Sequence, residues 1–201
     1  NIKPEFSDNI ISIGVSLESQ LMSIKNFIKK QKKNKTIIMF PNNQYADLIE
    51  KKLKKFDLDN SKIFKYTPDP QVLTGEIEKL TNYSQRKKNL ELRKKMFEDK
   101  EDEASIKELE KLEQLYTLGS VNFDSVIIID FGNNLKSVLT SLVYTDVNQN
   151  EVLFTTVNQW FDESIFYENT VKSLYYPSVN YKEFKKYKDN YFKIFNNFPS
   201  E

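Results

Sequence analysis

The sequence predicts an α/β fold: a Rossmann-like, three-layer lobe with a mostly parallel sheet and an inserted helical hairpin. Short β-rich runs alternate along the chain with segments whose apolar residues recur at helical spacing. The run at residues 36–40 is continuously β-rich, as expected for a strand that helices cover on both faces. Strands that alternate with helices in this way form right-handed βαβ units, and therefore a parallel sheet.

The strands and helices are predicted in chain order. A short leading strand at residues 10–15 precedes four core strands at 36–40, 62–66, 125–130 and 151–157, and a fifth core strand follows at 173–176. Side chains that can cap a helix, or proline turns that can start one, follow most of these runs. The predicted helix starts are Ser16, Asn42 or Asn43, the turn at residues 67–70, Asn133 and Tyr181, and the last helix ends at Asn196.

Residues 83–118 interrupt this alternation. The segment is rich in Lys, Arg and Glu and carries leucines at helical spacing, while its middle, residues 98–105, is acidic and poor in apolar residues. We predict two helices joined near residues 100–104. A charge-rich segment of this kind is either a solvated helical hairpin that extends one edge of the domain or an arm that docks a partner protein.

Composition excludes several classes of function. The 201 residues carry a net charge of +1, which argues against general affinity for nucleic acid. No apolar run is long enough to cross a bilayer, so no membrane span is predicted. The chain has no cysteine and no histidine, so thiol chemistry is excluded and the commonest general base and metal ligand are missing.

The usual catalytic motifs are also absent from the sequence. Neither a GxGxxG nor a GxxxxGK[ST] phosphate loop occurs. Asp130-Phe131-Gly132 matches the magnesium-binding triplet of protein kinases, but a kinase also needs a His-Arg-Asp catalytic loop and a Gly-rich loop. We therefore expect a protein that is not an enzyme and that binds no cofactor and no metal. A third hypothesis, a cytoplasmic enzyme, would require activity without histidine or cysteine.

Ligands of parallel α/β sheets bind beyond the carboxyl ends of the strands. In this chain that edge should hold four short segments, at residues 41–45, 67–69, 130–134 and 158–160.

Several segments, in this order, resemble the type 1 periplasmic-binding-fold proteins, the superfamily of the leucine/isoleucine/valine-binding proteins. Residues 14–56, "GVSLESQLMSIKNFIKKQKKNKTIIMFPNNQYADLIEKKLKKF", are similar to the entry into the second lobe, with Tyr45-Ala46 in place of a Tyr-Gly pair. "LGSVNFDSVIIIDFGNNLKSVL", "EVLFTTVNQWFDES" and "YKEFKKYKDNYFKIFNNFPSE" resemble the later landmarks. The helical insertion brings the chain nearest to the penicillin-binding-protein activator lipoproteins.

The resemblance implies the domain organisation and the cell compartment. Residues 10–178 would form the second lobe of a two-lobed protein, with the hairpin at 83–118 inserted in it. Residues 1–9 would belong to the first lobe or the hinge, and residues 179–201 would return toward the first lobe. The protein would be exported to the periplasm, with a lipid anchor in some members of the family. We expect exposed aromatic residues near the C-terminus, where the first lobe would pack.

The resemblance also implies five ligand-binding candidates. Tyr45 would line the cleft, or else pack at the start of its helix. Asn134 falls where the family places an acidic residue that grips the ligand's ammonium group; Asp130 would substitute for it, or cap the following helix. Phe131 would be an aromatic residue of the cleft, and Trp160 would contact the ligand or pack in the core or hinge.

Two functions follow from the resemblance. The first is a non-enzymatic, solute-binding lobe for a small polar, amino-acid-like ligand that is delivered to an ABC-type permease. The alternative is a regulatory adaptor, with an empty cleft, that activates a penicillin-binding protein, a cell-wall synthase, in peptidoglycan synthesis.

Overall fold

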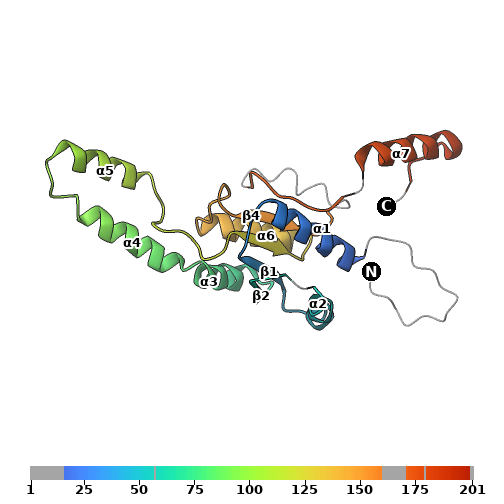
Figure 1. Cartoon of the computed structure of the whole chain (residues 1–201), viewed down its shortest axis with the longest axis horizontal. Helices are drawn as coiled ribbons and strands as arrows, with labels where there is room; N and C mark the ends of the chain where they lie inside the picture. Colours follow the sequence, from blue (N-terminus) through green and yellow to red (C-terminus); the bar gives the residue numbers. More distant parts are fainter. Residues whose placement is uncertain (1–15, 57, 160–170, 179, 200–201) are drawn as a thin grey trace.

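Four parallel strands form the sheet of the computed structural model, which describes residues 16–56, 58–159, 171–178 and 180–199 (Figure 1). The strands are β1 (Thr36–Pro41), β2 (Ser61–Tyr66), β3 (Ser125–Ile128) and β4 (Leu153–Thr156), in the spatial order β2-β1-β3-β4. Their register places Met39 of β1 between Phe64 of β2 and Ile128 of β3. The parallel sheet with helices around it confirms the predicted α/β, Rossmann-like fold.

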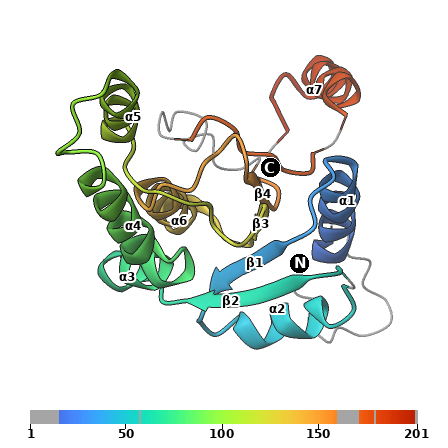
Figure 2. The same cartoon turned by 60° about the vertical axis from the view of Figure 1, so that its left-hand side comes forward.

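Helices cover both faces of the sheet (Figure 2). In β1, Ile37 and Met39 pack with helices α3 (Pro70–Leu80) and α6 (Gly132–Tyr144). The alternate residues of the strand, Ile38 and Phe40, pack with helices α1 (Leu17–Lys30) and α2 (Ala46–Leu53). All four side chains are buried. Side chains of a strand point alternately to its two faces, so one apolar run contributes to two core layers.

Local sequence explains where several helices begin. The Ser16 side chain accepts a hydrogen bond from the Ser19 N–H and caps α1, as predicted. Asp69 caps α3 in the same way and is followed by Pro70 at the first helical position. Asp102 caps α5 (Glu103–Glu113), and Asn180 caps α7 (Tyr181–Phe195).

Two predicted helix starts are wrong by a few residues. Helix α2 begins at Ala46 and not at Asn42 or Asn43, because the Asn43 side chain accepts a hydrogen bond from the Tyr45 N–H (2.9 Å) and holds a turn before the helix. Helix α6 begins at Gly132, one residue before the predicted start.

The predicted strands need two corrections. Strand β2 lies at the edge of the sheet, and its Ile63 is 48% exposed. The predicted fifth strand at 173–176 is reduced to one parallel bridge between Thr155 and Tyr175. It ends there because Pro177 has no N–H to continue the ladder. The predicted leading strand at 10–15 lies outside the described residues.

The predicted hairpin is present and projects from one end of the molecule (Figure 1). We call α4 (Tyr83–Lys95), residues 96–102 and α5 the arm. Helix α4 follows α3 after a break at Asn82, whose φ of +51° is left-handed. The arm therefore starts from the end of α3, and the chain returns from it to β3.

Helix α7 lies at the opposite end of the molecule from the arm (Figure 1). Large aromatic side chains of this C-terminal region are exposed, including Tyr187, Phe195 and Phe198. The expectation of exposed aromatic residues near the C-terminus is thus confirmed. Within the described ranges, no helix combines the length and the apolar character that crossing a membrane requires.

Candidate ligand-binding site

At one point in the sheet, the helices that follow two neighbouring strands pack on opposite faces. After β1 the chain enters α2, which packs on the α1 side of the sheet, and after β3 it enters α6, which packs on the other side. The loops at the carboxyl ends of β1 and β3, two neighbouring strands, therefore leave in opposite directions (Figure 2). Crevices at such switch points are where open α/β sheets bind ligands. Four of the five predicted site residues lie at this point: Tyr45, Asp130, Phe131 and Asn134.

The loop after β1 is held by hydrogen bonds of its own backbone. The Asn42 N–H donates to the Tyr66 carbonyl at the end of β2 (2.7 Å), and the Ala46 N–H donates to the Asn43 carbonyl (2.9 Å). Together with the Asn43 side-chain bond, these contacts fix the backbone that carries Tyr45. The Tyr45 side chain is 45% exposed. It is therefore not a core residue, and one part of its ring faces solvent at the sheet's carboxyl edge.

The loop after β3 has a second half-exposed aromatic ring, Phe131, which is also 45% exposed. The backbone N–H of Phe131 donates to Asp130 Oδ1 (2.8 Å), and Phe131 itself is extended, with φ of −141°. Gly132 follows with φ of +54°, a left-handed conformation that favours glycine. This sharp turn lets α6 start directly after the strand and leaves Phe131 at the edge.

Asp130 is buried below this edge and is held by Tyr66. The Tyr66 hydroxyl donates to Asp130 Oδ2 at 2.5 Å, and the two side chains are 0% and 7% exposed. Because β1 lies between β2 and β3, this bond crosses the carboxyl end of β1. Both carboxyl oxygens of Asp130 thus have a donor, and the group is fixed in one position.

Opposing effects act on the pKa values of this pair. Burial raises the pKa of Asp130 above its ordinary value, while the hydrogen bonds from Tyr66 and Phe131 and the amide of Asn134 favour its charged form. Burial, and then the nearby Asp130 charge, raise the pKa of Tyr66. Tyr66 therefore stays protonated and acts as the donor. Asn134, predicted as a ligand residue, is thus placed beside Asp130.

Gln159 follows the carboxyl end of β4. Its side chain is fully buried, and its Nε2 donates to the carbonyls of Asp130 (3.0 Å) and Val157 (3.1 Å). Its Oε1 is buried and has no hydrogen-bond partner among the described residues. The amide therefore ties the end of β4 to the end of β3.

Sequence reasoning missed Tyr66 and Gln159 as site residues. Both lie in or next to segments assigned to the carboxyl edge, since Tyr66 ends a predicted strand and Gln159 falls within 158–160. Convergence of strand ends was therefore a usable signal for them. Trp160, the fifth predicted site residue, lies outside the described residues.

The edge offers polar and aromatic groups but few groups for metal binding. Across the described parts of the chain, no three acidic side chains come together as metal ligands would. The arrangement can stack aromatic rings on a small molecule and present one fixed carboxyl group to it. Comparison of the sequence with protein-family models and with curated proteins gives no significant match.

Proposed function

We propose that the chain is a non-enzymatic, ligand-binding lobe of a periplasmic solute-binding protein, for a small polar, amino-acid-like ligand. One observation carries the proposal. At the switch point between β1 and β3, the half-exposed side chains Tyr45 and Phe131 lie on hydrogen-bonded loops, and Phe131 directly follows the buried Asp130, to whose carboxyl group its N–H donates. A site with apolar walls and few placed polar groups is the usual form of a small-molecule site.

The chemistry of these groups matches an amino-acid-like ligand. The aromatic rings would cover its apolar part, and the Asp130 carboxylate would attract its ammonium group. Asn134 beside Asp130 adds an amide that can both donate and accept. Since Asp130 is already held by Tyr66 and Phe131, binding would require little reordering of the carboxyl group.

The exposed aromatic side chains of α7 support the two-lobed part of the proposal. Helix α7 is at the end of the molecule that is remote from the arm (Figure 1). Tyr187, Phe192 and Phe195 are 52%, 41% and 61% exposed. Large apolar groups gathered on one helix usually pack against another body, and we assign this helix to the junction with a first lobe.

Calorimetric titration of the two-lobed protein that contains this chain tests the function, with amino acids, small amides and peptidoglycan fragments as ligands and thermal-shift measurements alongside. We expect heat and a raised melting temperature with at least one amino acid. Tyr45→Ala and Phe131→Ala should each weaken its binding about tenfold, the equivalent of about 1.4 kcal/mol. Tyr116→Ala is the matched control, because Tyr116 is 78% exposed and follows the arm.

Absence of both heat and thermal shift with every compound would refute the ligand-binding function. That result would favour the adaptor function, in which the lobe serves a cell-wall synthase with an empty cleft. An equal effect of Tyr116→Ala would show that the site lies elsewhere.

A further inference from the structure

The arm carries apolar side chains that its two helices do not cover. Helices α4 and α5 bury Leu90 and Leu112, which are 2% and 4% exposed. Leu92 and Ile106 remain 52% and 46% exposed, as does Met96 at 58%. Two helices in contact bury only one face each, so a free pair leaves its other faces in water.

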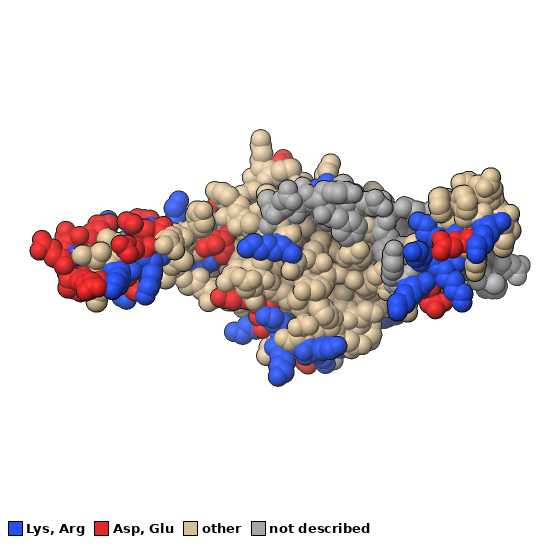
Figure 3. All heavy atoms as spheres, turned by 90° about the horizontal axis from the view of Figure 1, so that it is seen from above, with Lys and Arg blue, Asp and Glu red and all other residues tan. Residues whose placement is uncertain are grey.

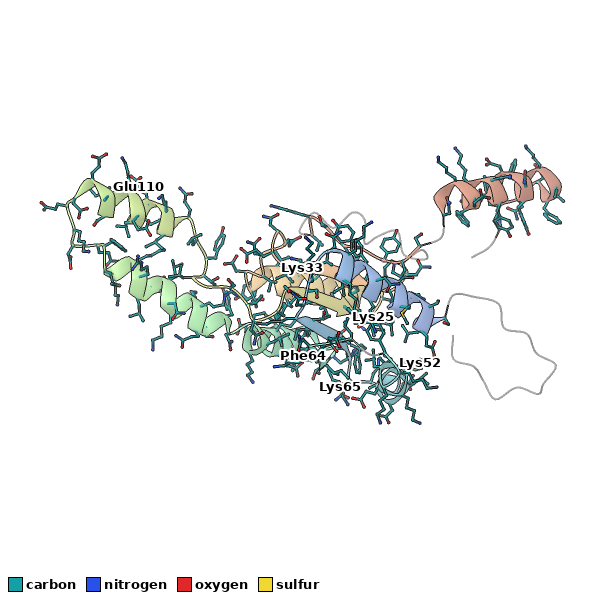
Figure 4. The ribbon with its side chains drawn as sticks, in the orientation of Figure 1. Lys25, Lys33, Lys52, Phe64, Lys65 and Glu110 are labelled. Carbon is teal, nitrogen blue, oxygen red and sulfur yellow. The ribbon has the colours of Figure 1, made fainter. Side chains whose placement is uncertain are left out.

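Charge is divided between the two halves of the arm. Residues 83–95 carry six basic side chains and one acidic, a net charge of +5. Residues 96–113 carry eight acidic side chains and three basic, a net charge of −5. Acidic side chains gather at the outer end of the arm, with basic ones beside them (Figure 3), and Figure 4 labels Glu110 among those of α5.

These opposite charges do not pair across the arm. Its ion pairs within the described residues join Lys107 to Glu103 and Lys111 to Glu108, all on α5, and link Arg86 to Asp146 outside the arm. The remaining basic residues of α4 thus have no acidic partner on α5 in the described structure. The charge is left for a partner outside the arm.

Helical spacing places apolar and charged residues on the same outer faces. On α4, Leu92 and Met96 share a face with Lys88 and Lys95, at spacings of three, four and seven. On α5, Ile106 shares a face with three acidic residues at the same spacings, Glu103, Glu110 and Glu113. Leu90 and Leu112 lie on the inner faces, so these groups point away from the contact between the helices. Each outer face therefore combines apolar side chains with an excess of one charge. The α4 face is basic apart from Glu91, and the α5 face is acidic apart from Lys107, which pairs with Glu103.

We propose that copies of this chain associate through their arms, with the basic outer face of α4 in one copy on the acidic outer face of α5 in another. The contact covers Leu92 and Met96 with Ile106 and pairs the lysines of α4 with the glutamates of α5. Opposite charges steer the encounter and fix which helix meets which, while the apolar side chains supply the burial. A second copy carries both faces that this pairing needs, so no further partner is required.

Charge reversal tests the pairing. One triple variant reverses the outer-face charges with Lys88→Glu and Lys95→Glu and adds Lys87→Glu at the exposed neighbour of Lys88, which gives residues 83–95 a net charge of −1. The other, Glu103→Lys, Glu110→Lys and Glu113→Lys, makes both halves basic. All six side chains are exposed. Circular dichroism checks that each variant keeps its helices, and Ile106→Ser tests the apolar part without changing charge.

Sedimentation velocity at low salt over a concentration series is the measurement. We expect the native chain to self-associate, each triple variant to associate at least about tenfold more weakly, and an equimolar mixture of the two variants to associate again. Ile106→Ser should weaken association, and added salt should weaken it in the native chain.

A native chain that stays monomeric at all concentrations would overturn the proposal. So would a mixture of the two folded variants that stays monomeric, because complementary arms would then be insufficient. If the native chain associates but neither variant changes that association, the contact lies outside the arm and the proposal is wrong.

Discussion

Replacing Arg86 with Met should destabilise the chain by about 3 kcal/mol, because Arg86 joins the arm to the body of the molecule. The guanidinium group of Arg86 donates to the carbonyls of Gly119 (2.8 Å), Thr145 (3.0 Å) and Asp146 (2.7 Å), and to the Thr117 hydroxyl (2.8 Å). These residues precede β3 and β4, so Arg86 fastens α4 to the amino-terminal edge of the sheet.

The magnitude follows from which acceptors would be left without a donor. Thr145 is fully buried, and Thr117 is 6% exposed, whereas Gly119 is exposed and Asp146 is half-buried, so water can replace the donor at the last two. A buried polar group that loses its partner costs about 1–3 kcal/mol. Methionine keeps most of the apolar stem, so two losses add up. The orphaned Thr145 carbonyl costs about 1.5 kcal/mol, and the lost charged hydrogen bond to Thr117, whose hydroxyl keeps its bond to Asp146 Oδ2, costs about 1.5 kcal/mol.

Urea unfolding of Arg86→Met measures the loss, with Arg93→Met as the matched control. Arg93 lies on the same helix, and its guanidinium is 4.8 Å from the centre of the Phe97 ring. Loss of that cation–π contact should cost about 0.5–1 kcal/mol. Hydrogen exchange should show faster exchange in α4 for Arg86→Met only. If Arg86→Met lost no more stability than Arg93→Met, the hydrogen bonds of Arg86 would not be what holds the arm to the sheet.

Three further predictions concern the carboxyl edge. Tyr66→Phe removes a donor to Asp130 and should lower the unfolding free energy by about 1–2 kcal/mol, and in titration followed by NMR it should raise the Asp130 pKa further. Asp130→Asn should gain stability relative to the native chain as pH rises from the ordinary Asp pKa of 3.8 through the raised folded-state pKa. Between these two pKa values the native carboxyl binds more protons in the folded than in the unfolded chain, so native stability falls with pH. Urea unfolding at several pH values measures this difference, and a flat difference would contradict it. Gly132→Ala should cost about 1 kcal/mol because φ is +54°, and an unchanged urea midpoint would show that the turn relaxes without strain.

The layers of the fold were predictable because the local sequence of a strand shows which of its two faces are buried. The run at 36–40 is apolar at every position, and both faces of β1 are buried. Strand β2 gives no such signal, since Lys62 and Lys65 flank the short apolar pair Ile63-Phe64. That mixed run forms the exposed edge strand, whose position depends on pairing with β1 and not on its own pattern.

The placement of the candidate residues at the carboxyl edge was predictable, but their contacts were not. The rule on strand ends places Tyr45 and Asp130 at one edge from the order of elements alone. The bond between Tyr66 and Asp130 depends on β1 lying between β2 and β3, and spatial strand order is not written in any local segment.

The burial of Arg86 is a feature that the sequence did not predict. This residue lies within a run of basic residues that predicts a solvated face, yet it is 7% exposed. Its acceptors come from the loops before β3 and β4, which are distant in sequence. Its spacing of four from Leu90 places it on the inner face of α4, but Lys87 lies at a spacing of three from Leu90 and is exposed, so spacing alone does not single out Arg86.

The proposed ligand site and the proposed contact between arms lie at opposite edges of the sheet. The arm is fastened by Arg86 to the loops that enter β3 and β4, at the amino ends of the strands. Tyr45 and Phe131 follow the carboxyl ends of β1 and β3. Association through arms would therefore leave the carboxyl edge of each copy uncovered, because the strands and the core separate the two surfaces. Coupling between ligand binding and association would have to pass through the buried layer between α3 and α6, which is closely packed. The two functions can then be tested one at a time, since a change on the arm leaves the residues of the candidate site in place.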